Sequence, residues 1–535
     1  MDEDGTSDVL VSVSSEQDSG VFSGPIVLSG IDGTEAVKLN MFDNYSPISV
    51  GDIDGDGRID LVGVDSEGRV CAARMDSEMI WCTPESVGTL GNAYTGATAF
   101  FSSLRIADLN GDGLTEVVSA RAIIRGDTGE VIYEFQGLEG SSDYSEVVVA
   151  DLDGDGMQEI LRNWRVYNHE GQAVHQLEPI DEELTTVVPI PVQYDDDDEA
   201  EIVWIGITGI ILSEADGFEI SRVLYPETEE RVTPMDSCAG DITGDGRMEF
   251  FTSDMNYLYA WTLDLEILWA FPIEDDTGGV VGCSLFDFDL DGRKEIVYAD
   301  AFNNYILDGE GQILFQDTSW DSKTAFEIPM VVDLDGDGSV EIIFSGFPWE
   351  SRENPSVRVF THPEGVLPPG GRFWPGDTWS GTSVWLDGTV PRQPEVPWLK
   401  YGVWRGQPEY LAYGRDLVPE VTDTCVSSCW EEVGTVSLSV RLENRGPQEA
   451  RAGTPMAVYG LDEAGAYQLL EVLTLAEPLA AGWAADTEEV TIDRAQAVRG
   501  LRFVAGDDGA GTLPDDDCDR DNNILDWAQD LCAGL

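Results

Sequence analysis

Short apolar runs of three to six residues, separated by turn-forming residues, recur through the first two thirds of the chain. One run, Val147–Ala150, enters an acidic loop, and a second, Ile160–Leu161, leaves it. Two more runs then flank a polar turn, as in Arg165–Tyr167 and Ala173–Leu177. Runs of this length with frequent turn signals and no helical periodicity predict β-strands, four to each repeat.

The acidic loop itself occurs seven times. Its copies begin at Asp52, Asp108, Asp151, Gln193, Asp241, Asp287 and Asp333, which are 56, 43, 42, 48, 46 and 46 residues apart. This period is that of a supersecondary repeat. Seven four-stranded units predict an all-β fold, a seven-bladed β-propeller over residues 46–370. Residues 1–45 carry three β-like pieces, and we expect them to close the propeller by lending a strand to the last unit.

Two further regions follow the repeats. Residues 371–415 are rich in tryptophan and proline, and we interpret them as a connecting segment held onto the repeats by buried aromatics, with a carbohydrate-stacking surface as the alternative. Residues 416–535 alternate apolar and polar positions, as at Val436, Leu438, Val440 and Leu442. This pattern predicts a small β-sandwich.

Each loop offers oxygen ligands at regular spacing. Positions 1, 3 and 5 are mostly Asp, position 6 is Gly in six of seven copies, position 9 is always acidic, and position 7 varies as if only its carbonyl were used. Hard oxygen ligands in this arrangement suit Ca²⁺. An EF-hand is excluded because its bidentate Glu at position 12 is replaced by Gly63, Ser119, Arg162, Trp204, Thr252, Tyr298 and Phe344.

The predicted ligands come from positions 1, 3, 5, 7 and 9 of each loop, for up to seven Ca²⁺ ions. They are Asp52, Asp54, Asp56, Arg58, Asp60; Asp108, Asn110, Asp112, Leu114, Glu116; Asp151, Asp153, Asp155, Met157, Glu159; Asp195, Asp197, Glu199, Glu201; Asp241, Thr243, Asp245, Arg247, Glu249; Asp287, Asp289, Asp291, Arg293, Glu295; and Asp333, Asp335, Asp337, Ser339, Glu341. The fourth site is the doubtful one, because Gln193 stands at position 1 and Asp196 and Asp198 replace the usual glycines.

The motif DxDxDGxx[DE], repeated in register, resembles the FG-GAP/VCBS repeats of integrin α-subunit propellers and their bacterial relatives. The resemblance implies a seven-bladed propeller with Ca²⁺ in the loop between the first two strands of each blade. Leu442–Gly446, Ala450–Pro455 and Cys518–Asn523 are similar to the bacterial CARDB module. That second resemblance implies an adhesion-associated, immunoglobulin-like domain at residues 416–535.

The charge of the chain narrows the possible partners. With 103 acidic and 29 basic residues, the net charge is −74, which argues against nucleic acid and anionic membrane surfaces as partners. Bound cations or adaptation to salt could each account for part of this charge. The longest apolar run, Ile202–Leu212, is too short to span a bilayer. The acidic start of the chain is no signal peptide, so we expect that any leader has been removed.

Eight cysteines favour an oxidising compartment. Cys71 and Cys82 lie symmetrically about a predicted turn, so they face each other across a hairpin and are expected to form a disulfide. Whether Cys238 and Cys283 pair stays open. So does the connectivity of the four cysteines near the C-terminus, Cys425, Cys429, Cys518 and Cys532.

Catalysis finds little support in the sequence. The three histidines, His169, His175 and His362, supply few groups for imidazole chemistry, and we do not expect an enzyme. From the resemblance we expect a secreted or cell-surface protein that binds Ca²⁺ and adheres to a surface protein or a polysaccharide. The alternatives are a lectin and a polysaccharide lyase or hydrolase, because a fold does not dictate a function.

Overall fold

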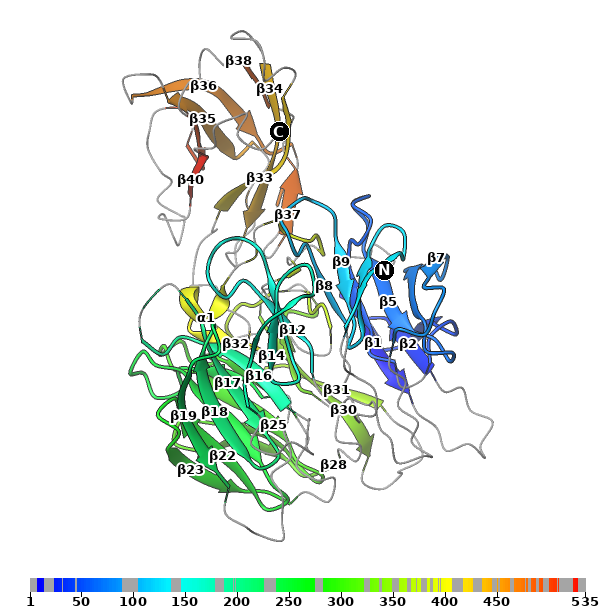
Figure 1. Ribbon diagram of the computed structural model, residues 1–535, viewed down its shortest axis with the longest axis vertical. Helices are drawn as coiled ribbons and strands as arrows, with labels where there is room; N and C mark the ends of the chain where they lie inside the picture. Colours follow the sequence, from blue (N-terminus) through cyan, green and yellow to red (C-terminus); the bar gives the residue numbers. More distant parts are fainter. Residues whose placement is uncertain are drawn as a thin grey trace. The chain divides into compact units, whose positions relative to one another are not determined.

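The computed structural model places the chain in two compact units, residues 1–367 with 373–408 and residues 368–372 with 409–535 (Figure 1). The residues that the structure describes are 7–13, 24–30, 32–43, 46–88, 104–135, 146–178, 187–195, 197, 199–225, 237–274, 282–321, 328–335, 339–348, 356–362, 367–371, 373–376, 383–384, 388–392, 394, 396–406, 417–426, 435–444, 450, 453–461, 466–476, 478–479, 483–486, 490–493, 500–507, 509 and 523–527.

Six of the seven repeats form the predicted antiparallel sheet of four sequential strands. The first three sheets contain β4 (Ser49–Gly51), β5 (Asp60–Val64), β6 (Val70–Arg74) and β7 (Met79–Cys82); β8 (Arg105–Ala107), β9 (Glu116–Val118), β10 (Ala122–Arg125) and β11 (Val131–Glu134); and β12 (Val148–Ala150), β13 (Glu159–Arg162), β14 (Arg165–Tyr167) and β15 (Ala173–Gln176). The next three contain β16 (Val187–Val192), β17 (Glu201–Gly206), β18 (Gly209–Glu214) and β19 (Glu219–Leu224); β20 (Ala239–Gly240), β21 (Glu249–Ser253), β22 (Tyr257–Thr262) and β23 (Ile267–Pro272); and β24 (Cys283–Phe286), β25 (Glu295–Ala299), β26 (Asn304–Leu307) and β27 (Ile313–Asp317).

The seventh repeat differs in its strand order. β30 (Glu341–Pro348) pairs with β29 (Met330–Val332), with β31 (Ser356–Phe360) and with the short β28 (Trp320–Asp321). The N-terminal strands β1 (Val9–Val13), β2 (Gly24–Leu28) and β3 (Glu35–Lys38) form a separate three-stranded sheet. Among the described residues these strands form no ladder with the seventh repeat, contrary to our expectation, although the amide of Ser7 donates to the carbonyl of Leu334 at 2.9 Å.

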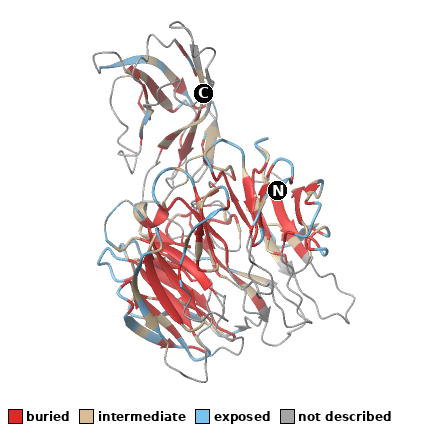
Figure 2. Cartoon of the chain, in the orientation of Figure 1, coloured by how far each residue is buried: buried red, intermediate tan, exposed pale blue. Residues whose placement is uncertain are grey.

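Burial falls from the first strand of each sheet to the fourth. In the fourth sheet, β16 and β17 are buried throughout, whereas β19 alternates exposed and half-buried residues (Figure 2). The same contrast separates β25 from β27. The first strands therefore lie inside the unit and the fourth strands lie at its surface.

Consecutive sheets share apolar cores. Val62 and Ile106, from the first two repeats, belong to one cluster, and the fifth, sixth and seventh repeats contribute to another. The N-terminal sheet contacts repeats at both ends of the series. Val27 of β2 clusters with Leu61 of the first repeat, and Val9 of β1 clusters with Val332 of the seventh.

The described residues between 373 and 406 lie against inner strands of this unit, and we call them the strap. The amide of Val50 donates to Pro375 (2.8 Å) and the amide of Asp52 donates to Gly388 (2.7 Å). Further along, α1 (Pro397–Lys400) contacts β16, and β32 (Val403–Trp404) pairs with β20. Trp398 and Trp404 are buried and join the core of the third to fifth sheets, which confirms the buried-aromatic interpretation for these two residues.

The second unit contains two antiparallel sheets around one core. One consists of β33 (Leu417–Val426), β34 (Thr435–Asn444), β37 (Trp483–Asp486) and β38 (Val490–Asp493), and the other of β35 (Pro455–Leu461), β36 (Tyr467–Thr474), β39 (Leu501–Ala505) and β40 (Ile524–Trp527). Leu438 and Phe503, from opposite sheets, share the core. An immunoglobulin-like topology stays a prediction, and Cys429, Cys518 and Cys532 lie outside the described residues.

Two disulfides join described strands. Cys71–Cys82 links β6 and β7, as predicted, and Cys238–Cys283 links the segment before β20 to β24. The helices of the described residues include none long and apolar enough to cross a bilayer. The described chain is thus all-β, with a few short turns of helix at most.

Candidate cation-binding loops

Each acidic loop connects the first and second strands of its sheet, and its position 1 Asp organises the turn. Asp151 accepts hydrogen bonds from the amides of Gly154 and Gly156, both at 2.9 Å. The Asp52, Asp108, Asp241 and Asp287 carboxylates receive the corresponding amide of position 6 at 2.7–2.8 Å. Position 6 has a φ of +81° to +88° in these five loops, which explains the recurring glycine.

The acidic residue at position 9 hydrogen-bonds to the backbone near the start of every loop. Its carboxylate accepts the amide of position 2 in all seven copies, at distances from 2.6 Å in the fourth loop to 3.3 Å in the first. Most position 1 and position 9 side chains are buried, whereas positions 3 and 5 are mainly exposed. The loops that have Asp at position 1 therefore hold two inner carboxyls that accept backbone amides, and their outer ligand positions lie nearer to solvent.

Burial raises the pKa of the inner carboxyls. Loss of solvent is the main cause at position 9, and nearby Asp side chains add to it, so the pKa reaches about 6 at Asp60, about 8 at Glu159, and about 7 at Glu116, Glu201, Glu249 and Glu295. The pKa of Asp52, Asp108 and Asp151 is raised for the same reason. These groups therefore ionise less readily than solvent-exposed carboxyls.

The predicted ligands converge in several loops. Carboxylate oxygens lie within 4.8 Å of one another in the sets Asp52–Asp54–Asp60, Asp151–Asp153–Glu159, Asp195–Asp197–Glu201 and Asp287–Asp289–Asp291. In the fourth loop, one oxygen of the fully buried Glu201 has no hydrogen-bond partner. A buried acceptor oxygen beside further carboxylates is the kind of group that coordinates a cation, so the residues present fit a hard divalent ion such as Ca²⁺.

The position 7 side chains make ion pairs or lie exposed to solvent, and these arrangements do not suggest that they bind a metal. Arg58 and Arg293 pair with the Asp two residues before them, and Arg247 pairs with Asp264 at 3.1 Å. Leu114 and Met157 are exposed. These observations agree with a position that offers only its backbone carbonyl, although Ser339 in the seventh loop is buried. Asp337 lies outside the described residues.

The fourth loop has Gln193 where the other loops have Asp. The side-chain oxygen of Gln193 accepts the amide of Asp195 (3.1 Å), and its side-chain amide donates to the carbonyl of Asp197 (2.5 Å). Glu214, opposite Glu201 in the ladder, brings a further carboxyl whose pKa is raised by burial and by Asp195. The loop that the sequence marked as doubtful therefore carries additional negative charge.

The first loop contains its own cation. The guanidinium of Arg74, on β6 opposite Asp60, lies 2.7 Å from Asp54, 2.9 Å from Asp56 and 2.6 Å from Asp60. Sequence reasoning missed this residue because it lies outside the loop motif. The one feature of the sequence that could have identified Arg74 is its place in the strand pairing, directly opposite position 9 of the loop. The residue at the same place is Arg125 for the second loop and Glu214 for the fourth.

Replacing Arg74 by Ala should make the first loop more responsive to calcium. The three carboxylates lose their shared counter-ion, so the metal-free variant should melt several degrees below wild type, while calcium should raise its melting temperature by more than it raises that of wild type. Arg58→Ala is the matched control, because Arg58 is exposed and pairs with Asp56 alone. An equal calcium response in the two variants would show that Arg74 does not occupy the cation position.

Asp151→Ala should destabilise the protein more than Asp195→Ala. Asp151 is buried and holds two amides, whereas Asp195 is exposed and makes no comparable bond through its side chain among the described contacts. We expect a loss of about 1–3 kcal/mol in the free energy of unfolding for Asp151→Ala and less than about 0.5 kcal/mol for Asp195→Ala. Urea unfolding in EDTA measures both, and the reverse order would contradict the role given to position 1.

Comparison with known proteins agrees with the repeat. Residues 52–119 match the model of the FG-GAP-like repeat family, a stretch that holds the first two acidic loops. A search of curated proteins finds no match. Among solved structures, the V. cholerae biofilm matrix protein Bap1 is similar at 16% identity with a TM-score of 0.57, over 76% of this chain and 96% of that chain.

A rhamnogalacturonan lyase from Bacillus licheniformis is 16% identical over 71% of this chain and 77% of that chain, but its TM-score of 0.46 is too low to support an argument. At such identities the likeness to Bap1 concerns the fold alone. The chain thus contains an FG-GAP-like repeat at residues 52–119 within a fold built from repeated β-sheets.

Proposed function

We propose that this protein is an extracellular, calcium-stabilised β-propeller that binds a polysaccharide. The observation that carries the proposal is the set of position 9 carboxyls, most of them buried, which in the first six loops lie beside further acids and have a raised pKa. A protein that works at millimolar external calcium can use such groups, because sites of this kind bind at about 10⁻⁴–10⁻³ M. The two disulfides support the same compartment.

The propeller arrangement is supported by the order in which the sheets pack. Neighbouring loops are linked in series: the amide of Ala200 in the fourth loop donates to Leu152 in the third (2.8 Å), and that of Lys294 in the sixth donates to Asp241 in the fifth (2.9 Å). The N-terminal sheet contacts the first and last repeats. Closure through this sheet would leave no exposed inner edge.

A polysaccharide ligand is favoured by the likeness to a biofilm matrix protein and by the −74 charge, which argues against anionic macromolecules. The test is retention of the full chain on immobilised neutral and acidic polysaccharides, with calcium and with EDTA. We expect calcium-dependent retention without release of reducing ends. Retention only on proteins would contradict the proposal, and release of reducing ends would identify an enzyme instead.

A further inference from the structure

A pocket lies at the end of the fifth and sixth sheets that is opposite the acidic loops. Strand β25 begins at its acidic loop, and the turn at its far end borders the pocket together with residues 272–274 at the end of β23 and residues of β26 and β27. It has a volume of about 400 Å³, in the range of small-molecule sites. The strap covers inner strands near the acidic loops but contributes no residue to this pocket.

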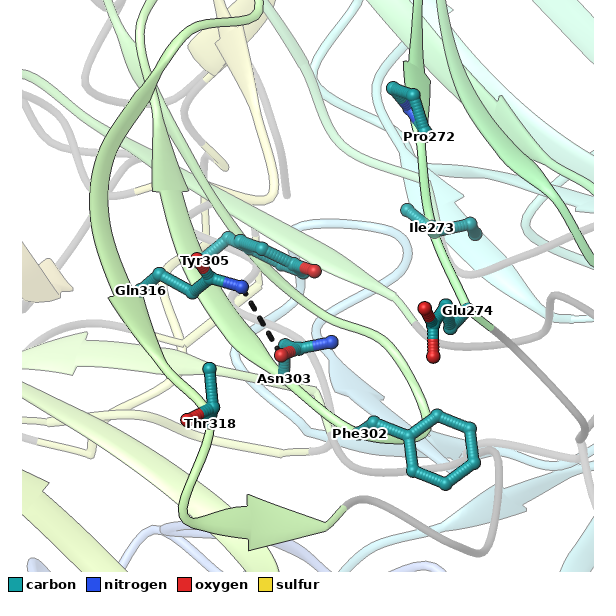
Figure 3. A pocket seen from close by; sticks show the side chains of 8 residues that line it. All are labelled: Pro272, Ile273, Glu274, Phe302, Asn303, Tyr305, Gln316 and Thr318. Carbon is teal, nitrogen blue, oxygen red and sulfur yellow. Dashed lines mark hydrogen bonds between the residues drawn. The ribbon is translucent and has the colours of Figure 1, made fainter.

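Polar side chains line the pocket in a fixed arrangement. In Figure 3 the amide of Asn303 lies between Gln316 and Glu274, and the Nε2 of Gln316 donates to the Oδ1 of Asn303 at 3.2 Å. The ring of Phe302 lies beside them. Amide and carboxylate groups can each serve two adjacent hydroxyls, and an aromatic ring packs against the C–H face of a sugar.

The buried carboxylate of Asp300 fixes the backbone of the pocket turn and the side chain of Asn303. It accepts the amides of Phe302 (2.8 Å) and Asn303 (2.6 Å), the side-chain amide of Asn303 (3.1 Å) and the hydroxyl of Tyr305 (3.1 Å). Glu274 also donates its backbone amide to Asp300 at 3.0 Å. A site held in place in this way loses little conformational entropy when a ligand binds.

The neighbouring sheet provides an internal comparison. In the turn between β21 and β22, Asp254 accepts two backbone amides at 2.7 Å and the hydroxyl of Tyr259 at 2.8 Å, which repeats the bonds of Asp300. There, Tyr257 stands in place of Asn303, and Ala270, opposite Tyr259, stands in place of Gln316. The turn therefore forms without the Asn303–Gln316 pair. The presence of these two amide side chains in the sixth sheet is thus not required for the turn to fold.

We infer that this pocket binds one neutral, hydroxyl-rich sugar residue of a polysaccharide chain, an inference that rests on the proposed function and locates its site. The charge of the pocket selects against acidic sugars. Glu274 is one of its walls, Asp300 lies beneath it, and none of the described lining residues is basic. A uronate or sulfate group would meet only negative or neutral side chains.

The experiment uses the full chain on an array of neutral, uronate-containing and sulfated glycans, followed by calorimetric titration with the best neutral oligosaccharide. Gln316→Ala and Phe302→Ala should each raise its Kd by about tenfold, the loss of one good contact. Tyr257→Ala, at the equivalent place in the neighbouring turn, should leave the Kd unchanged. Gln316 is exposed, so its variant should also keep the wild-type melting temperature.

Two results would overturn the inference while leaving the proposed function intact. One is an unchanged Kd in both pocket variants. The other is retention limited to anionic glycans and abolished by salt, which would require a basic surface elsewhere. Failure to bind any glycan on the array would contradict the proposed function itself, and the pocket assignment with it.

Discussion

Chelation of calcium at pH 8 should lower the melting temperature of this protein by about 10 °C or more, and at pH 5 by much less. Each site with a Kd near 10⁻⁴ M contributes about 2 kcal/mol at a few millimolar calcium. Several such sites within one unit add to a shift of this size. Thermal melts with calcium and with EDTA across this pH range measure the effect.

The pH dependence follows from the position 9 carboxyls. Their pKa in the folded, metal-free protein is raised to between about 6 at Asp60 and about 8 at Glu159, above the ordinary value of a carboxyl. A raised pKa means that folding takes up a proton, so the stabilisation is complete below about pH 4 and is lost as the pH rises through the folded value. The metal-free protein should therefore melt at progressively lower temperature between pH 5 and pH 8.

Calcium reverses this trend because it neutralises the ionised form of the same carboxyls. Repulsion among the surface acids also grows with pH, so the melts are repeated at high ionic strength, where exposed charges are screened. Magnesium is the second control, since it prefers a smaller octahedral site and keeps its water. A metal-free melting temperature that rises from pH 5 to pH 8, or no effect of EDTA at pH 8, would refute a structural role for calcium.

The sequence predicted the elements whose partners are near in the chain. The loop motif and its flanking apolar runs predicted strands such as β12 and β13, because a nine-residue turn brings them together. The symmetry of Cys71 and Cys82 about a turn predicted their disulfide for the same reason. The spacing of residues along the chain is sufficient to predict a pair of strands wherever a hairpin turn sets their register.

Contacts between distant residues could not be predicted in this way. Cys238 and Cys283 are 45 residues apart in neighbouring sheets. Arg74 reaches the first loop from β6, and the pocket combines Asn303, from the turn before β26, with Gln316 of β27. Such pairs depend on which sheets lie side by side and on side-chain direction, and neither follows from periodicity in one sequence. The strand order of the N-terminal segment was missed because its three short runs can pair with one another as easily as with the seventh repeat.

A buried ion cluster beneath the strap should make a large contribution to the free energy of unfolding. Glu146, immediately before β12, is 2% exposed, and its carboxylate lies 2.8 Å from the guanidinium of Arg105. It also pairs with Arg405, the residue after β32, which is itself 2% exposed and has a φ of +57°. Arg405 donates in addition to the carbonyl of Ser237 at 3.3 Å. One carboxylate therefore joins the second and third sheets to the strap.

Glu146→Gln should cost about 3–5 kcal/mol in the free energy of unfolding, because it removes the negative charge that two buried guanidinium groups share. The substitution keeps the shape of the side chain, so the loss reports charge and not packing. Urea unfolding in calcium, with Glu130→Gln as an exposed control expected to stay within about 0.5 kcal/mol of wild type, measures the difference. Arg405→Met should cost less than Glu146→Gln, since the pair of Arg105 and Glu146 remains neutral in its absence. If both glutamate variants unfold like wild type, the ion cluster contributes nothing to the attachment of the strap, which then depends on its backbone hydrogen bonds and on the buried Trp398 and Trp404.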